Sequence, residues 1–274
     1  MIINTGYTMV PALKKLWKEG FGDEDRYIDL FFSKRFKPEN TFAYMEKGFP
    51  VSIASVLEAS LYHNGTFIPA WYIYGVTTSS SYRGKGYGTA VIEHINKMYP
   101  AAFLVPSSED LIAFYIRRGF LPAFSMKELV FHGNDLNIKE KNIKSETVFP
   151  DEYKNIRDSC FTKNGYICWD AQAIAYALEE NSLLGGCALK VQLNDKKKSN
   201  GIILYRIQNN ELFVSETTLP LPVLRDTVCM LMKQRGVCVC RVRCQTGKAN
   251  PGRPFGLLRS DITIRNGYCN LVLD

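Results

Sequence analysis

Residues 74–90 read Tyr74-Gly-Val-Thr-Thr-Ser-Ser-Ser-Tyr-Arg-Gly-Lys-Gly-Tyr-Gly-Thr-Ala90, and this stretch carries the most informative pattern in the chain. A β-rich run from Thr66 to Thr78 leads into it, and an amphipathic helical stripe over residues 91–98 follows it. The segment Arg83-Gly-Lys-Gly-Tyr-Gly88 between them has three alternating glycines. Glycines at a helix N-terminus let backbone N–H groups converge on an anion. The pattern therefore predicts a strand, a phosphate-binding loop and a helix.

The loop differs from two common phosphate-binding motifs. No Gly-Lys-Ser/Thr occurs at the spacing of a Walker loop, and Thr89 stands where the dinucleotide fingerprint needs its third glycine. Glycine content alone is equally compatible with a phosphate site and with a tight structural turn. Arg83 and Lys85 add positive charge at the same loop, so they favour the phosphate site.

The same stretch resembles the coenzyme A signature of the GNAT superfamily of N-acetyltransferases, Gln/Arg-x-x-Gly-x-Gly/Ala, with Arg83, Gly86 and Gly88 in its fixed places. A second motif follows in the family's order. The segment Ser108 to Phe120 is similar to the strand–helix segment that ends in Phe-Tyr-x-x-x-Gly-Phe. Two motifs in order are far more specific than either alone. The resemblance covers residues 1–131 and implies an α/β (α+β) GNAT fold, a mixed and mostly antiparallel sheet flanked by helices.

This resemblance implies acetyl-coenzyme A as a co-substrate. In the family a splayed strand pairs with the pantetheine arm, which assigns that contact to Val76, Thr77 and Thr78. The Val76 N–H would then stabilise the oxyanion of the tetrahedral intermediate, an effect worth roughly 3 kcal/mol. Ser108 stands where many members carry an Asn that touches the cofactor, so this contact is expected to be weaker. The expected pyrophosphate-binding residues are Arg83, Gly84, Lys85, Gly86, Tyr87 and Gly88.

Tyr115 is the catalytic residue that the resemblance implies. The family's tyrosine protonates the departing thiolate of coenzyme A, a step that needs a weak acid within hydrogen-bond reach of the sulfur. Without the motif, a core tyrosine packed on the sheet would be the better interpretation.

The sequence does not identify the base that deprotonates the amine. In Eis-type relatives the terminal carboxylate does this work. The tandem layout here is similar to the first two domains of those enzymes, but their sterol-carrier-like third domain is missing, so Asp274 is not expected to inherit the role. The remaining candidates, each more typical of a structural residue, are Glu46, Glu58, Tyr72, Tyr74 and His94.

The second half repeats the element order of the first with little sequence identity. We expect a catalytic domain over residues 1–131, a polar linker over 132–146 and a degenerate GNAT-like domain over 147–274. The segment Leu219-Pro-Leu-Pro222 replaces the glycine loop there and has lost two N–H groups to proline, so it should not bind a pyrophosphate. This domain either shapes the acceptor pocket or only stabilises the first, and the sequence leaves both possibilities open.

Composition excludes several classes of protein. The chain has 274 residues, of which 46% are apolar and 22% charged, as in ordinary globular domains. The net charge of +7 suits an anionic ligand but is too dilute to require nucleic acid. Neither a signal peptide nor an apolar stretch long enough to span a bilayer is found, so a cytoplasmic protein without a membrane partner is expected. The sequence does not indicate an oligomeric state.

All eight cysteines lie in the second half of the chain. Cys238, Cys240 and Cys244 alternate with Arg241 and Arg243, a pattern that favours a strand with its thiols in the core over a zinc site. Reduced thiols and no bound metal are therefore expected.

The prediction is an N-acetyltransferase that moves acetyl from acetyl-coenzyme A to a primary amine by direct attack in a ternary complex. Two alternatives remain: a non-catalytic acyl-coenzyme A binding or sensing protein, and a polyanion- or partner-binding module that uses the positive charge. The acceptor can be a small molecule or a peptide, because fold does not determine substrate.

Overall fold

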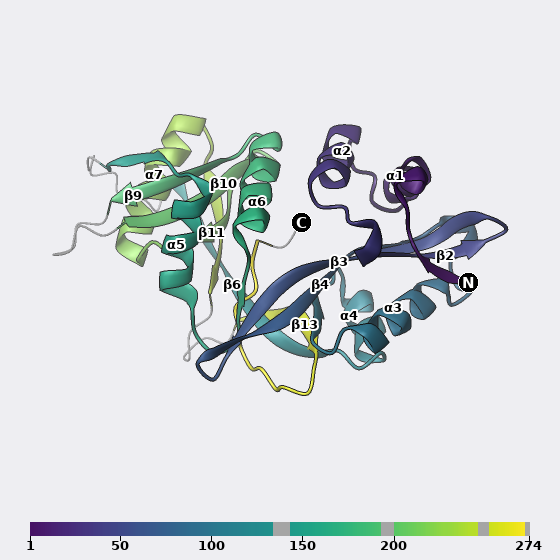
Figure 1. Cartoon of the computed structure of the whole chain (residues 1–274). Coiled ribbons are helices and arrows are strands. Elements are labelled where there is room, and N and C mark those ends of the chain that lie inside the picture. The colour runs from purple at the N-terminus through teal and green to yellow at the C-terminus, as the bar shows by residue number, and fades with distance from the viewer. Residues whose placement is uncertain (134–142, 193–199, 246–251, 272–274) are drawn as a thin grey trace. The chain divides into compact units, whose positions relative to one another are not determined.

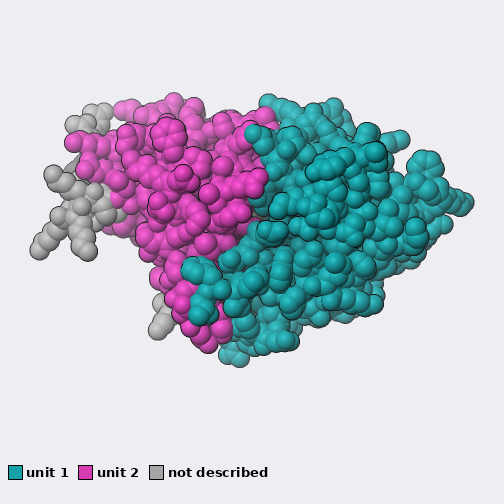
Figure 2. Space-filling model, in the orientation of Figure 1, with its two compact units in different colours: residues 1–61, 66–123, 256–265 teal, residues 62–65, 124–255, 266–274 magenta. Residues whose placement is uncertain are grey.

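The computed structural model describes residues 1–133, 143–192, 200–245 and 252–271 (Figure 1). Contacts between residues divide the chain into two compact units (Figure 2). Unit 1 comprises residues 1–61, 66–123 and 256–265, and unit 2 comprises residues 62–65, 124–255 and 266–274. No helix within the described ranges is long and apolar enough to cross a membrane.

Unit 1 begins with a short strand and two helices, continues through a three-stranded meander and two helices around a short strand, and takes its last strand from the C-terminal part of the chain. Its sheet has the order β1-β2-β3-β4-β5-β13, with β5 parallel to β4 and antiparallel to β13. The elements are β1 (Ile2–Asn4), α1 (Val10–Phe21), α2 (Asp25–Lys34), β2 (Thr41–Glu46), β3 (Phe49–His63), β4 (Thr66–Thr78), α3 (Tyr87–Met98), β5 (Ala102–Leu104), α4 (Glu109–Ile116) and β13 (Arg253–Arg259). Short 3-10 turns lie at Tyr7–Met9, Pro38–Asn40 and Ser80–Tyr82.

Helices cover both faces of the unit 1 sheet (Figure 1). On one face, Trp17 of α1 packs against Phe31 of α2 at 4.7 Å and Tyr74 of β4 at 5.3 Å between ring centroids. On the other face, α3 and α4 bury an apolar cluster that includes Val91 and Phe120. The helical stripe predicted over residues 91–98 is buried at Val91, Ile92 and Ile95, because residues three and four apart share one side of a helix, whereas Met98 at its end is exposed.

Unit 2 has the same strand order. Its sheet runs β7-β9-β10-β11-β12-β6, with β12 parallel to β11 and antiparallel to β6. Helix α7 covers one face, and α5 and α6 pack on the meander. The elements are β6 (Leu121–His132), β7 (Ser145–Thr147), α5 (Pro150–Phe161), β8 (Tyr166–Cys168), α6 (Ala171–Leu183), β9 (Cys187–Gln192), β10 (Asn200–Gln208), β11 (Glu211–Thr217), α7 (Leu221–Arg235) and β12 (Val239–Gln245).

The two halves of the chain exchange their closing strands. Strand β6 follows α4 in sequence but pairs with β12 of unit 2, whereas β13 comes from the C-terminal part and pairs with β5 of unit 1. Sequence analysis missed β13. It also placed residues 145–146 in the linker, although β7 begins at Ser145. The expected domains, residues 1–131 and 147–274, are continuous in sequence, whereas the two units defined by contacts are not. The expected domains remain a prediction.

The cysteine-rich strand has the predicted alternation. Cys240 is fully buried with Val242 in the core under α7, and Cys244 packs against the same cluster. Cys238 differs, because β12 begins one residue later and the Cys238 side chain is exposed. All eight cysteines are free thiols, and within the described ranges no three His, Cys, Asp or Glu side chains group as metal ligands.

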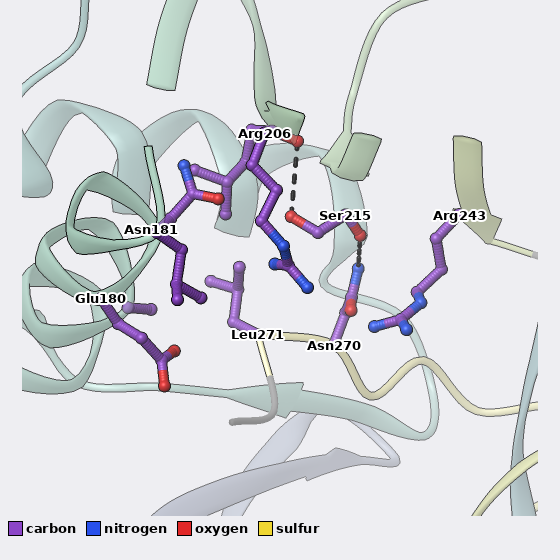
Figure 3. A pocket seen from close by; sticks show the side chains of 10 residues that line it. Glu180, Asn181, Arg206, Ser215, Arg243, Asn270 and Leu271 are labelled. Carbon is purple, nitrogen blue, oxygen red and sulfur yellow. Dashed lines mark hydrogen bonds between the residues drawn. The ribbon is translucent and has the colours of Figure 1, made fainter. Parts of the chain in front are cut away.

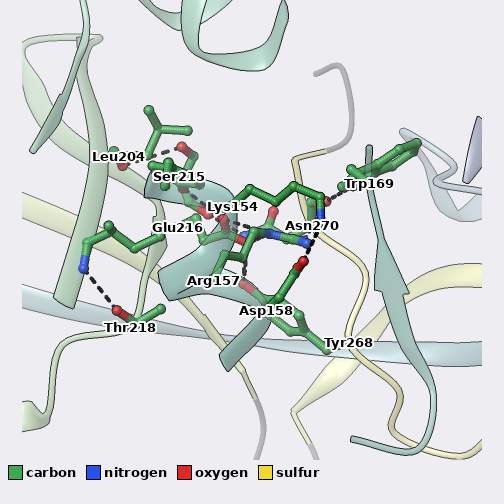
Figure 4. A network of polar contacts seen from close by, with 12 residues as sticks. Lys154, Arg157, Asp158, Trp169, Leu204, Ser215, Glu216, Thr218, Tyr268 and Asn270 are labelled. Carbon is green, nitrogen blue, oxygen red and sulfur yellow. Dashed lines mark hydrogen bonds and ion pairs between the residues drawn. The ribbon is translucent and has the colours of Figure 1, made fainter. Parts of the chain in front are cut away.

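A buried ion pair lies in the core of unit 2 (Figure 4). Nε of Arg157 on α5 donates to both carboxylate oxygens of Glu216 on β11, each at 3.1 Å, and both side chains are fully buried. The hydroxyls of Tyr153 and Tyr268 each donate to Glu216 at 2.8 Å, and Tyr166 also contacts Arg157. Because each charge has several partners, the pair is tolerated inside an otherwise apolar core.

Replacement of Arg157 by Met should destabilise unit 2 by about 3–5 kcal/mol, because Glu216 would keep its buried charge without a counter-ion. Urea unfolding followed by tryptophan fluorescence measures this change. The matched control is Arg241→Met, since Arg241 forms an ion pair on β12 with 44% of its side chain exposed, and this substitution should destabilise the protein far less than Arg157→Met. Equal losses in the two variants would contradict the prediction.

Candidate active site

The backbone of β4 changes phase at Gly75. The Trp71 N–H donates to Ala101 O on the β5 side, whereas the Ser79 N–H donates to Val51 O on the β3 side, each at 2.9 Å. In a regular strand the N–H groups of residues an even number of positions apart, such as Trp71 and Ser79, point to the same side. Here they point to opposite sides, so one residue is inserted between them, as in a β-bulge. Gly75 is the residue with a positive φ, 63°, and a Cβ there would lie 2.8 Å from the Trp17 ring. Only glycine fits this position.

The bulge directs the backbone of Val76 and Thr78 away from β3, toward the side on which β5 lies. There β4 pairs with β5 at Trp71–Ala102 and Tyr72–Phe103, and β5 ends at Leu104. Strand β4 therefore runs on to Thr78 beyond its last pair with β5, with the N–H groups of Val76 and Thr78 directed to that side. The Val76 side chain packs against the apolar cluster beneath α3 and α4.

The glycine loop ends in an open helix N-terminus. Gly84 and Gly86 have φ of 77° and 83°, Gly86 is the N-cap of α3, and nothing lies within 4 Å of where their Cβ atoms would be. The first hydrogen bond of α3 runs from Ala90 N to Gly86 O. The amides of Tyr87, Gly88 and Thr89 therefore precede the first helical hydrogen bond and point out of the helix, where they can bind an anion.

Gly88 lets α3 approach β4 closely. A Cβ on Gly88 would lie 3.1 Å from Thr78 Oγ1, which itself hydrogen-bonds Ser52 Oγ at 2.9 Å. The positive charges flank this turn. Arg83 donates from Nε to Thr78 O at 3.1 Å, and Lys85 Nζ lies 4.8 Å from the centroid of the Tyr82 ring. Both charged side chains are exposed, so they can reach a phosphate.

Glu19 of α1 holds the start of the loop, a role that sequence analysis did not predict. Its Oε1 accepts from Ser80 N and Ser80 Oγ, each at 2.7 Å, and from Ser79 Oγ at 3.1 Å. The backbone hydrogen bond from Ser80 is the largest cause that lowers the pKa of Glu19, and Arg83 adds to it. Glu19 is 60 residues distant in sequence from this loop, and no local signal marks it.

Removal of this tether should loosen the loop without touching the chemistry. Glu19→Ala is expected to raise the KM for acetyl-coenzyme A about 3–10-fold at unchanged kcat, as for the loss of one to two hydrogen-bonded contacts. Steady-state kinetics measure this split. Glu24→Ala removes an exposed carboxylate that pairs with Arg26 and should change neither constant. A fall in kcat in Glu19→Ala would contradict a positioning role.

Tyr115 lies on α4 with 6% of its surface exposed. Its ring packs edge-on against Phe120 at 5.8 Å and Phe114 at 5.1 Å, in the same apolar cluster that Val76 contacts. Burial raises the pKa of Tyr115 to about 12, and Arg118 partly offsets this effect. The hydroxyl forms no hydrogen bond within the described part of the chain. The side chain is therefore a protonated phenol at neutral pH, free to donate.

Arg118 connects the two motifs. Its Nη1 donates to Phe114 O at 2.5 Å and its Nη2 donates to the Thr89 hydroxyl in the first turn of α3. The guanidinium stands over the Phe114 ring at 3.4 Å, and burial is the largest cause that lowers its pKa. Arg118 occupies a variable position of Phe-Tyr-x-x-x-Gly-Phe, so the motif gave no reason to select it.

Ser108 has another function in this structure. It is the N-cap of α4, and its Oγ accepts from Leu111 N at 3.3 Å. The expected contact between Ser108 and the cofactor therefore competes with capping, and it stays a prediction.

The base candidates are dispersed. Glu46 is linked to the end of the glycine loop by a hydrogen bond, because its Oε2 accepts from the Tyr87 hydroxyl at 3.3 Å. The Tyr87 ring also stacks on Tyr44, with 4.4 Å between the ring centroids. Glu58 forms an exposed ion pair with Lys37 at 3.5 Å. The other candidates have aromatic or hydroxyl partners: Tyr74 contacts Tyr27, Tyr72 stacks on Phe103, and His94 packs against Phe42. None of these contacts identifies a base.

Comparison with known protein families gives a match over the part of the chain that contains the glycine loop and Tyr115. Residues 4–123 match the family described as the acetyltransferase (GNAT) domain. A search of curated proteins gave no match to this sequence. Among solved structures, a GCN5-related N-acetyltransferase from Anabaena variabilis is 15% identical with a TM-score of 0.73, covering 94% of this chain and 72% of that one.

Two further solved structures share the fold. A protein of unknown function from Enterococcus faecalis, described as a probable N-acyltransferase, is 14% identical with a TM-score of 0.74 and shares of 94% and 71%. Eis1 from Mycobacterium abscessus is 13% identical with a TM-score of 0.61 and shares of 88% and 65%. Identities this low establish the common fold, and the family match rests on the N-terminal part. Residues 4–123 of this chain match the acetyltransferase (GNAT) domain, and the solved structures show that the chain shares the fold of such proteins.

Proposed function

We propose that this acyltransferase moves the acetyl group of acetyl-coenzyme A to a primary amine by direct attack in a ternary complex. The observation that carries the proposal is the combination of a bulged strand running past its parallel neighbour with an open helix N-terminus at its end. In this proposal the Val76 N–H serves the acetyl end of the donor molecule, and the amides of residues 83–88 serve the pyrophosphate.

The roles of the residues follow from their chemistry. The amine attacks the thioester carbonyl, the Val76 N–H donates to the developing oxyanion, and the carbon–sulfur bond breaks as the carbonyl reforms. Tyr115 is a protonated phenol that can donate its proton to the thiolate. Thr77 and Thr78 border the same strand segment, and Arg83 and Lys85 supply charge for the phosphates. A base for the amine is not assigned.

Release of free coenzyme A with a panel of amines tests the proposal. We expect release that depends on both acetyl-coenzyme A and one amine class, with initial rates in a two-substrate matrix that give intersecting lines. Parallel lines would indicate a covalent acetyl-enzyme and contradict direct attack. Binding of acetyl-coenzyme A without release for amino acids, polyamines, aminoglycosides or lysine peptides would contradict the enzymatic function.

A further inference from the structure

Arg118 lies in the turn that follows α4, and its hydrogen bonds fix that turn against α3. Its Nη2 donates to the hydroxyl of Thr89 in the first turn of α3, and its carbonyl oxygen accepts from Nδ2 of Asn96 at 3.3 Å. Thr89 and Asn96 are seven residues apart, which is about two helical turns, so both lie on the same face of α3. Arg118 therefore holds the two segments together at two points.

The same residue is bonded to the segment that carries Tyr115. Nη1 of Arg118 donates to Phe114 O at 2.5 Å, and its backbone N–H donates to Tyr115 O at 2.8 Å. The guanidinium carbon lies 3.4 Å from the centroid of the Phe114 ring, and that ring stands edge-on to the Tyr115 ring at 5.1 Å between centroids. The position of the Tyr115 ring therefore depends on contacts that Arg118 makes.

Arg118 differs from the buried arginine of unit 2. The Arg157 charge is paired with Glu216, and its Nη2 donates to Asn270 O at 3.4 Å. Asn270 is fixed in turn, because its Nδ2 donates to Ser215 O at 2.6 Å (Figure 3). Within the described ranges Arg118 forms no ion pair, so no carboxylate there neutralises its charge as Glu216 neutralises that of Arg157. Such a guanidinium stabilises negative charge that develops near it.

Packing alone does not account for a charge at this position. Arg118 Nε is buried and has no hydrogen-bond partner among the described residues, which is unfavourable for an N–H group. Burial is the largest cause that lowers the pKa of Arg118, and the charge of Glu93 on α3 acts in the opposite direction. An apolar side chain would cover the Phe114 ring without this cost. The charge therefore requires a second explanation.

The charge of Arg118 acts on the phenol of Tyr115. Burial raises the pKa of Tyr115 to about 12, and the Arg118 charge works against this rise. It does so because a nearby positive charge favours the phenolate over the phenol. A phenol that gives up its proton during a reaction passes through a state with phenolate character, and Arg118 stabilises that state more than the starting one.

We propose that Arg118 is the positioning residue for the proton donor: it holds the Tyr115 turn against the first turn of α3 and stabilises the phenolate that forms there. This inference rests on the proposed acetyl transfer. The phenol proton moves to the sulfur of coenzyme A as the carbon–sulfur bond breaks, and the phenolate that remains recovers a proton from solvent. Through Thr89, one side chain sets the place of the proton donor relative to the amides proposed for the pyrophosphate.

Substitutions at Arg118 test the effect on catalysis. Arg118→Gln removes the charge and should lower kcat at least about 30-fold, while the KM for acetyl-coenzyme A stays within about threefold. Arg118→Lys keeps a charge but not the planar fork, and its kcat should lie within about 10-fold of the wild type. The matched control is Arg117→Gln, since Arg117 is the preceding residue and is exposed, and its kcat should stay within about twofold.

A double-mutant cycle distinguishes positioning of Tyr115 from general support of the fold. In a Tyr115→Phe background, Arg118→Gln should lower kcat by no more than about twofold, because no proton donor remains to be positioned. Thermal melting verifies that each variant is folded, and Arg118→Lys replaces Arg118→Gln in the cycle if the latter does not fold. Coenzyme A release at saturating amine measures every kcat.

Two results would overturn the role of Arg118 alone. One is a loss of kcat by the same factor in the wild-type and Tyr115→Phe backgrounds, which is the mark of a structural defect. The other is a kcat of Arg118→Gln equal to that of Arg117→Gln. Both leave acetyl transfer intact, whereas a wild-type protein that releases no coenzyme A with any amine would overturn the proposed function and the role of Arg118 with it.

Discussion

Gly86→Glu is expected to abolish the thermal stabilisation that acetyl-coenzyme A gives the wild-type protein and to raise its Kd at least about 1000-fold. Gly86 is the N-cap of α3 with φ of 83°, a conformation that a residue with a Cβ adopts only under strain. The new carboxylate would also stand at the amides of Tyr87 and Gly88 and repel the pyrophosphate. The loss of about three charge-assisted hydrogen bonds accounts for the magnitude.

Gly65→Glu separates loop chemistry from general strain. Gly65 has φ of 86° with nothing within 4 Å of its Cβ position, so it matches Gly86 in conformation and in space. It lies in the turn before β4, at the opposite end of that strand from the loop. Gly65→Glu should lower the melting temperature as much as Gly86→Glu yet keep the full shift with acetyl-coenzyme A. Equal ligand shifts in both variants would refute a phosphate site at the loop.

Local signals in the sequence predicted much of the fold. The stripe predicted over residues 91–98 is buried at Val91, Ile92 and Ile95 of α3, as the helical period requires. The glycine loop was predicted for a similar reason, since a residue type without a Cβ reports directly on the backbone conformation at Gly84 and Gly86. The Phe-Tyr motif placed Tyr115 on a helix, and its Gly119 ends the α4 turn with φ of 85°.

Features that depend on distant contacts could not be predicted in the same way. The strand Arg253–Arg259 pairs with β5, about 150 residues earlier, and nothing in its own pattern distinguishes that partner from a strand of the second half. The sequence alone does not distinguish Gly75 from the other glycines, because its requirement for glycine comes from the Trp17 ring that packs against it. Glu19 and Arg118 act through hydrogen bonds to segments that the fold alone brings near them. Hydrophobic periodicity can be detected within one segment of sequence, whereas the partner of a strand or side chain is determined only when the whole chain has folded.

Unit 2 repeats the strand–helix–strand connection of the candidate cofactor site but lacks its glycine loop. Strand β11, helix α7 and strand β12 repeat the connection of β4, α3 and β5, including the parallel pairing. Helix α7, however, begins at Leu221 behind the N-cap Pro220, with a second proline, Pro222, in its first turn. Proline removes N–H groups that an anion would need, so the N-terminus of α7 offers fewer donors than that of α3, and the prediction that it binds no pyrophosphate stands.

Tyr115→Phe should lower kcat by about 10²–10³ while the KM for acetyl-coenzyme A stays within about twofold, because removal of a general acid affects the transition state and not donor binding. Tyr99→Phe is the matched control: burial also raises the pKa of Tyr99, which packs on the same apolar cluster, and this variant should keep kcat within about twofold. Stopped assays of coenzyme A release measure both.

The pH dependence and the leaving group distinguish a proton donor from a packing residue. With its pKa at about 12, the Tyr115 phenol stays protonated through neutral and mildly alkaline pH, so its ionisation should not limit kcat there. The unfolded chain loses this proton near pH 10, so the contribution of Tyr115 to stability is present below about pH 10 and is lost as pH rises to about 12; Tyr115→Phe should flatten that loss.

A donor with a better leaving group gives the decisive comparison. An acetyl thioester of an acidic aromatic thiol releases a thiolate that needs no proton, so the defect of Tyr115→Phe should shrink to about 10-fold or less with this donor. A packing defect would slow both donors equally, because it displaces the strand and the loop whichever thiol departs. An equal defect with both donors would therefore assign Tyr115 to the core and leave the proton on the thiolate to come from solvent.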